Sequence, residues 1–293
     1  MDLPENARTA PLQQTWKLTL AYDGTDFRGW QVQPDEITVQ GELQAALERV
    51  TGEAPLPQGS GRTDAGVHAL GQVASFALVA PIPPANLQRA LNRTLPPSIR
   101  ILEARTVPHT FHARHSAVAK TYEYRIFPGE ICPPFLARYA FAWPLPMDVE
   151  AMEMAARAFL GEHDFVSFAA SDPDLTTRRL ASPQEANQKL NAPAAPPALA
   201  VRTMYSSGWE RRTTEAGELL VYSVRGSGFL HHMVRNFVGT MLDVGRGHLR
   251  AGAIGEILDA RSRSAAGPTA PARGLFLHSV EYAEQAEFPP NDL

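Results

Sequence analysis

A glycine-rich stretch at residues 59–76 constrains this chain more than any other feature of its sequence. Gly59, Gly61 and Gly66 permit backbone conformations and close approaches that a side chain would block, and an alternating, strand-like run follows them. The stretch contains one carboxylate, Asp64. A loop of this kind holds its acid in a tight, uncrowded hairpin that can face a large substrate. We therefore interpret Asp64 as the reactive group.

A plain surface turn is the simpler interpretation of the Asp64 loop. Asp caps its own backbone in turns and Gly tolerates positive φ, so composition alone favours a turn over an active site. A dinucleotide-binding loop is excluded, because Arg-Thr-Asp at 62–64 stands where that fingerprint requires its third glycine. The nucleotide-triphosphate loop needs a Gly-Lys-Ser/Thr sequence, which this stretch lacks.

Length and composition indicate a globular protein. A chain of 293 residues can form one large domain or two ordinary ones, and 44% apolar with 20% charged residues is typical of a folded chain. No apolar run approaches the length that spans a bilayer, and the first residues lack the pattern of a secretory signal. The single cysteine, Cys132, excludes an internal disulfide and any multi-cysteine metal site. We expect a cytoplasmic protein.

The distribution of charge indicates a nucleic-acid contact more clearly than the net charge does. A net charge of −4 and a pI near 6.1 argue against a protein that coats nucleic acid nonspecifically. Between residues 86 and 125, however, the sequence contains only two glutamates against seven basic residues. These basic residues are Arg89, Arg93, Arg100, Arg105, Arg114, Lys120 and Arg125. A local RNA footprint on an otherwise acidic molecule fits this asymmetry. Chance is the alternative, since some window of any chain is basic.

Hydrophobic periodicity predicts strands and helices in two halves. The expected strands cover 16–22, 72–78, 99–107, 120–127, 164–168 and a hairpin at 204–211 and 219–225. The expected helices cover 84–94, 148–160, 229–244 and a segment that begins after the N-cap Thr38. Composition predicts a flexible tail at 1–15 and a flexible insertion at 171–200. The two α+β halves are then 16–115, which carries the Asp64 loop, and 116–285.

The helix expected at 229–244 carries an apolar stripe on one side, with Arg235 at its margin and His231 and His232 on different sides. A cation in this position often packs its stem and extends its head into water. The other interpretation is that its guanidinium reaches a cleft. The remaining histidine cluster at 109–115 has neither HExxH spacing nor a neighbouring carboxylate or thiolate, so we expect no metal site.

Several motifs resemble those of a known enzyme family. Residues 61–68, Gly-Arg-Thr-Asp-Ala-Gly-Val-His, are similar to the signature of the TruA family of tRNA pseudouridine synthases. Phe-His-Ala-Arg at 111–114, Lys-Thr-Tyr-Glu-Tyr at 120–124 and Phe-Leu-His-His-Met-Val-Arg-Asn at 229–236 follow in the family's order. Gly-Leu-Phe-Leu at 274–277 resembles the family's closing strand, so the similarity covers roughly residues 17 to 283.

The resemblance implies a fold and an activity. The fold is α+β, with two related α/β-type halves whose largely antiparallel sheets are flanked by helices around a central cleft. The activity is isomerisation of uridine to pseudouridine at positions 38–40 of the tRNA anticodon stem-loop, by a homodimer that requires no cofactor and no membrane.

The resemblance also implies roles for individual residues. Asp64 matches the catalytic acid, and Arg235 matches the basic residue that synthases of this kind place against it. Tyr122 matches the family's substrate-contacting tyrosine, although cross-strand packing is the simpler interpretation. An aromatic ring can stack on an extruded base, and its hydroxyl can act in proton transfer. The residues expected to bind substrate are Tyr122, Arg62, His68 and Arg114.

Two rival functions and two chemical routes stay open. A glycosidase-like hydrolase would need two carboxylates that flank the bond, and no second acid accompanies Asp64 in a comparable loop. A non-catalytic RNA-binding module would keep the basic face and lose Asp64. If the chain is a synthase, its aspartate either attacks the anomeric carbon of the sugar or removes a ribose proton.

Overall fold

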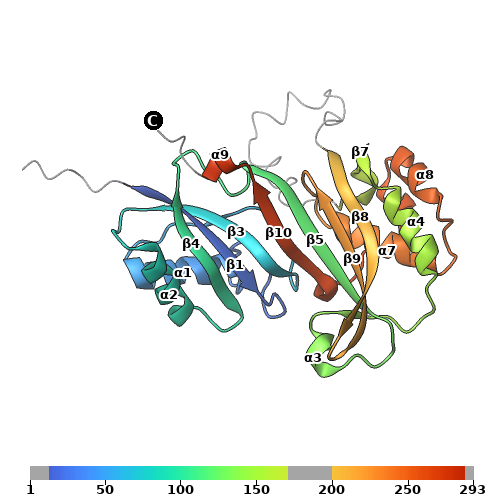
Figure 1. Ribbon diagram of the computed structural model, residues 1–293, viewed down its shortest axis with the longest axis horizontal. Coiled ribbons are helices and arrows are strands. Elements are labelled where there is room, and N and C mark those ends of the chain that lie inside the picture. Colours follow the sequence, from blue (N-terminus) through green and yellow to red (C-terminus); the bar gives the residue numbers. More distant parts are fainter. Residues whose placement is uncertain (1–12, 171–199, 288–293) are drawn as a thin grey trace, which may run out of the picture. The chain divides into compact units, whose positions relative to one another are not determined.

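The computed structural model describes residues 13–170 and 200–287 (Figure 1). The flexible tail predicted at 1–15 lies outside these residues except for its last three, and the insertion predicted at 171–200 lies outside them except for residue 200. Strand β1 (Gln14–Tyr22) includes two residues of the predicted tail. The first strand therefore begins two residues earlier than its alternating pattern indicates.

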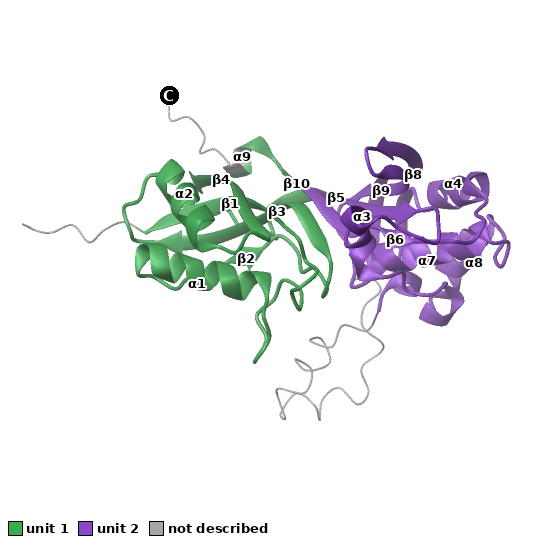
Figure 2. Cartoon of the chain, turned by 90° about the horizontal axis from the view of Figure 1, so that it is seen from below, with its two compact units in different colours: residues 1–118, 280–293 green, residues 119–279 purple. Residues whose placement is uncertain are grey.

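The described chain divides into two compact units (Figure 2). The first contains the described residues up to 118 and from 280 on, and the second contains the described residues from 119 to 279. The return of the chain to the first unit has a clear physical cause. The hydroxyl of Tyr282 donates a 2.6 Å hydrogen bond to the carbonyl of Ala113, its ring packs on Phe111, and the Lys17 ammonium lies 4.7 Å from its centroid.

The first unit is built on an antiparallel sheet in the order β4-β1-β3. Strand β3 covers His68–Leu78 and β4 covers Ile99–Val107, while the short β2 (Gln58–Gly59) pairs with β3 just before the Asp64 loop. Side chains alternate along each strand, so one face of β1 presents Trp16, Leu18 and Leu20, all fully buried. These residues form the core of the unit.

Helices α1 (Val39–Thr51) and α2 (Pro84–Thr94) lie on the same side of this sheet (Figure 1). The Thr38 hydroxyl accepts a 3.2 Å hydrogen bond from the Gly41 N–H and so caps α1, as predicted. Gly52, with φ +76°, ends this helix in the left-handed conformation. Leu43, Leu47, Leu87 and Leu91 are fully buried, and each such side chain contributes about 1.5–3 kcal/mol to folding.

The second unit contains a sheet in the order β10-β5-β9-β8-β7, in which β5, β9, β8 and β7 are antiparallel neighbours, while β6 pairs with β5 in parallel. Its strands are β5 (Ala117–Phe127), β6 (Phe141–Ala142), β7 (Gly161–Asp164), β8 (Val201–Thr214), β9 (Gly217–Gly226) and β10 (Leu275–Tyr282). The predicted hairpin is confirmed as β8 and β9, with Gly217 at φ +134° in its turn. The α+β class predicted for the chain is also confirmed.

The helices of the second unit are α3 (Pro134–Ala137), α4 (Val149–Arg157), α7 (Met233–Gly245) and α8 (Ala253–Ala260), with 3-10 turns at Val166–Phe168, Arg263–Ala265 and Ala272–Gly274 (Figure 1). Helix α4 packs against β8 and against α7, while α7 and α8 both contact the 3-10 turn at Val166–Phe168. A last short helix, α9 (Glu284–Glu287), belongs to the first unit. None of the helices in the described part of the chain has the length and apolar character that crossing a bilayer requires.

In the second unit, two predicted helices are wrong in extent and one predicted strand is wrong in type. The helix expected to reach residue 160 ends at Arg157, because the next three residues continue as tighter turns. The strand expected at 164–168 is instead the end of β7 followed by a 3-10 turn. Helix α7 begins at Met233, and of its residues all but Arg235 and Asp243 are buried, so it has no single apolar stripe.

Candidate active site

The Asp64 loop connects β2 to β3 in the first unit. The Val67 N–H donates a 3.1 Å hydrogen bond to the Asp64 carbonyl, and Gly66 inside this turn has φ +76°. A Cβ on Gly59 would lie 2.6 Å from the ring of Trp30, so only glycine fits there. The loop therefore has the tight geometry that its glycines predict, and it holds Asp64 half-buried.

A set of buried polar side chains lies beneath this loop. The Tyr22 hydroxyl and Thr63 Oγ1 share a hydrogen bond of 2.8 Å, and the Ser60 hydroxyl donates one of 2.6 Å to Gln72 Oε1. Gln72 Nε2 donates to the Gly61 carbonyl at 2.9 Å. Sequence reasoning missed this set, although a polar Gln72 on the inward face of an alternating strand is a signal that could have revealed it.

His68 and Arg62, both expected to bind substrate, lie in different environments. His68 is 1% exposed, and its Nδ1 accepts a 3.0 Å hydrogen bond from the Gly24 N–H and lies 3.2 Å from Asp23 Oδ1. This imidazole thus joins the first residue of β3 to the turn after β1. Arg62 is exposed on the loop.

Arg114 is exposed beside a pair of histidines in the first unit. The ring of His112 lies 4.4 Å from that of His115, and its Nδ1 accepts a 3.0 Å hydrogen bond from the Arg114 N–H. Burial, and then the neighbouring His115 and Arg114 charges, lower the pKa of His112. A neutral His112 keeps its acceptor and holds the Arg114 backbone in place.

Tyr122 and Arg235 belong to the second unit. Tyr122 lies on β5, is 7% exposed, and meets Phe229 edge-on with ring centroids 4.9 Å apart. Arg235 is half-buried in the first turns of α7, and its Nε donates a 2.7 Å hydrogen bond to the carbonyl of Ala270. Because its head is bonded to protein, Arg235 does not fit the interpretation of a side chain that only reaches into water.

The prediction that His231 and His232 lie on different sides of a helix is wrong, because both residues precede α7. His231 and His232 form the turn that precedes the helix, and their ring centroids are 3.9 Å apart. His232 has φ +60°, a left-handed conformation that is uncommon outside glycine and stops the helix from starting earlier. The segment from Phe229 to His232 is thus a loop at the N-terminus of the helix that carries Arg235.

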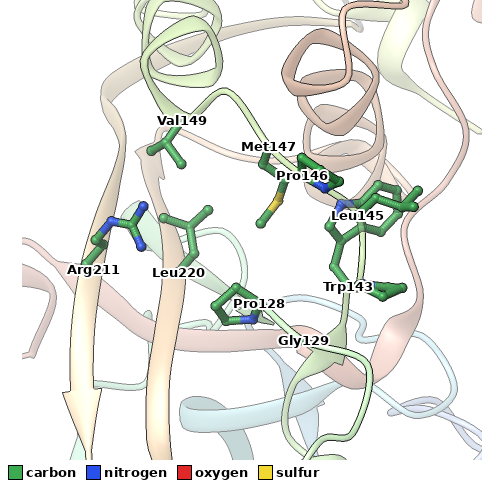
Figure 3. Close-up of a pocket in the computed structure, with 10 residues that line it drawn as sticks. Pro128, Gly129, Trp143, Leu145, Pro146, Met147, Val149, Arg211 and Leu220 are labelled. Carbon is green, nitrogen blue, oxygen red and sulfur yellow. The ribbon is translucent and has the colours of Figure 1, made fainter.

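A separate cavity of about 340 Å³ lies within the second unit (Figure 3). Arg211 and Leu220 lie on one side of it, and Trp143 and Leu145 on the other. Three prolines, Gly129, Met147 and Val149 complete a lining that contains no carboxylate. None of the residues expected to act on substrate lines this cavity, so it is not the candidate site.

Comparison with known proteins identifies the family. The sequence pattern described as tRNA pseudouridine synthase matches residues 19–116 and 155–283. The tRNA pseudouridine synthase A of Solibacter usitatus is 50% identical over 266 residues, which are 91% of this chain and 98% of that protein. Its namesakes from Moorella thermoacetica and Brevibacillus brevis are 45% and 42% identical, with the same shares covered. The chain belongs to the tRNA pseudouridine synthase family.

Proposed function

We propose that this protein is an isomerase that converts uridine to pseudouridine in tRNA. The observation that carries the proposal is its 50% identity to a curated tRNA pseudouridine synthase A over 98% of that protein's length. The half-buried Asp64 on its constrained loop supplies the acid that this reaction uses. The reaction breaks the glycosidic bond, turns the base and rejoins it to the same ribose through carbon, so no atom is gained or lost.

Asp64 is the proposed catalytic group, and it acts on the bond between sugar and base. Two routes lead through this carboxylate: attack on the anomeric carbon, or removal of a ribose proton that triggers cleavage. Because this bond is hidden in a stacked stem, the nucleotide must be extruded, at a cost of about a few kcal/mol. We propose that the exposed guanidinium of Arg62, two residues from the acid, binds phosphate beside the extruded nucleotide.

Tyr122 and Arg235 complete the proposed catalytic set. The tyrosine ring stacks on the extruded base and its hydroxyl moves a proton, and the guanidinium keeps Asp64 ionised. Arg114, exposed on the first unit, is proposed to bind the RNA backbone. For His68, which is 1% exposed, we propose support of the loop rather than a direct contact with RNA.

We further propose that the targets are uridines 38–40 of the anticodon stem-loop and that a cytoplasmic homodimer binds them. The test is incubation of the purified protein with unmodified tRNA transcripts, followed by mapping of carbodiimide adducts that survive alkali. Adducts at these positions support the proposal. Release of free uracil would indicate a hydrolase, and unchanged RNA with retained binding would indicate a non-catalytic module.

A further inference from the structure

We infer that Tyr22 and Gln72 are positioning residues that hold the Asp64 loop in its reactive conformation. Both lie in strands of the first unit, and neither belongs to the loop itself. The inference rests on the proposed function, in which Asp64 is the catalytic acid, and assigns it a supporting network.

Gln72 is the centre of the network. Its side chain is fully buried, and a primary amide offers two N–H donors and two acceptor lone pairs. Nε2 donates to the Gly61 carbonyl at 2.9 Å and to the Tyr22 hydroxyl oxygen at 3.4 Å. Oε1 accepts from the Ser60 hydroxyl at 2.6 Å and from the Val73 N–H at 3.2 Å. The amide therefore uses its full bonding capacity inside the protein.

Tyr22 extends the network to the residue before the catalytic acid. Its hydroxyl bonds to Thr63 Oγ1 at 2.8 Å, and burial raises its pKa to about 12, so it stays protonated. The carbonyl of Thr63 accepts a 3.0 Å hydrogen bond from the Trp30 N–H. Thr63 is thus held by both its side chain and its backbone, immediately before Asp64.

The network contacts three of the four residues that precede Asp64, namely Ser60, Gly61 and Thr63. Any shift of the loop would leave buried donors or acceptors without partners, which is unfavourable at a site closed to water. Misplacement of a reacting group by about 1 Å can slow a reaction by about 100-fold. A polar cluster beneath the loop is therefore suited to hold the carboxylate in register with the nucleotide.

Two substitutions test the bond between Tyr22 and Thr63. Tyr22→Phe and Thr63→Val each remove one hydroxyl and keep the size of the side chain. We expect each to lower kcat by about 10–100-fold while KM for tRNA stays within about threefold. Because both remove the same bond, the double variant should be no slower than the slower single variant. Thr63→Ser, which keeps the hydroxyl, should retain most of the activity.

A third substitution tests Gln72 through pH. Gln72→Glu keeps the shape but replaces the amide donor with a carboxylate that repels the Gly61 carbonyl. Burial favours the neutral acid, and a protonated glutamate can donate to that carbonyl as the amide does. We expect kcat of this variant, divided by that of the wild type, to rise as the pH falls. A purely structural lesion would leave this ratio flat.

The second unit offers a matched control. Tyr222 is fully buried, and its hydroxyl shares a 2.7 Å hydrogen bond with Ser207 Oγ, the same chemistry as the Tyr22–Thr63 pair. Tyr222→Phe should lower the thermal midpoint about as much as Tyr22→Phe and leave kcat unchanged. If Tyr22→Phe slows turnover no more than Tyr222→Phe does, the inference is wrong. A wild-type protein that forms no pseudouridine would instead refute the proposed function.

Discussion

Arg235 and Ala270 are joined by two hydrogen bonds in opposite directions. The Arg235 Nε donates to the Ala270 carbonyl at 2.7 Å, and the Ala270 N–H donates to the Arg235 carbonyl at 3.1 Å. The next residue, Pro271, accepts a 2.8 Å hydrogen bond from the hydroxyl of Tyr124 on β5. The guanidinium is therefore oriented by a segment that is itself fixed to the sheet of the second unit.

This orientation predicts a strong effect of substitution at Arg235. If the guanidinium keeps Asp64 ionised, Arg235→Gln should lower kcat by about 100-fold or more, as loss of an oriented charge does. The acid limb of its pH–rate profile should also move to higher pH, because the cation that favours the charged form is gone. A pH–rate profile of unchanged shape would show that Arg235 does not affect the ionisation of Asp64.

Asp64→Asn should abolish turnover while tRNA affinity stays within about one order of magnitude, because the amide keeps the shape of the side chain and loses its nucleophilic or basic oxygen. Single-turnover assays with mapped pseudouridine measure the first quantity, and filter binding measures the second. Pseudouridine formation by this variant at a rate close to that of the wild type would show that another residue is the catalytic acid.

Tyr122→Phe should lower kcat more than it weakens binding. The variant keeps the ring that packs on Phe229 and can stack on a base, but it lacks the hydroxyl proposed to transfer a proton. Measurement of kcat and KM for tRNA separates these contributions. An equal loss in kcat and in tRNA affinity would assign the hydroxyl to substrate binding instead.

Helices α1 and α2 could be predicted because their signals are local. Thr38 caps one helix and Pro84 opens the other, and each boundary depends on the residues next to it. The start of α7 depends instead on the left-handed conformation of His232. A helix that is buried on nearly every side also has no polar face to mark its ends, so periodicity extended it over the preceding loop.

The candidate site was predictable to a similar degree. Asp64 and its glycines are contiguous, so the sequence displays them together. The network beneath them is not contiguous, since Tyr22 is 41 residues from Thr63 and 50 residues from Gln72. The pairing of β1 with β3 brings Tyr22 close to Gln72, and hydrophobic patterns do not specify which polar atoms meet inside a sheet.

We expect the protein to lose stability in acid because of the ion pairs of Glu123. Burial alone would raise the pKa of this carboxyl, but hydrogen bonds and charges from Arg212 and Arg125 outweigh it and hold the pKa below its usual value of 4.5. Stability from a carboxyl with a depressed pKa is present above the unfolded value and is lost as the pH falls through the folded value.

The variant Glu123→Gln tests this assignment. At neutral pH it should lower the free energy of unfolding by about 1–3 kcal/mol, because a buried hydrogen bond to charged groups is lost. This gap in unfolding free energy between the variant and the wild type should narrow as the pH falls below 4.5, because the wild-type carboxyl then begins to take up a proton itself. Denaturant titrations across the pH range measure the gap, and the exposed Glu162→Gln should show little effect at any pH. A gap that does not change with pH would assign the stability to shape rather than charge.

Replacement of glycine by alanine should have opposite effects on stability at two helical positions of the second unit. A Cβ on Gly239 in α7 would lie 1.6 Å from the carbonyl oxygen of Pro268, a backbone atom that cannot rotate away. Gly239→Ala should therefore destabilise the protein by about 1–3 kcal/mol or more, as overpacking does. A Cβ on Gly255 in α8 would meet nothing within 4 Å, so Gly255→Ala should stabilise it by about 0.5–1 kcal/mol through lower backbone entropy of the unfolded chain.

The substitutions Gly239→Ala and Gly255→Ala also test whether packing around α7 affects turnover. The segment that Gly239 contacts includes Ala270, the residue that orients Arg235, so displacement of Pro268 should also move the guanidinium. We therefore expect Gly239→Ala to lower kcat at temperatures where the variant remains folded, while Gly255→Ala leaves kcat unchanged. Thermal unfolding followed by circular dichroism supplies the stability, and pseudouridine assays well below both midpoints supply the rate. If Gly239→Ala is destabilised but fully active, the approach of α7 to this segment serves stability alone.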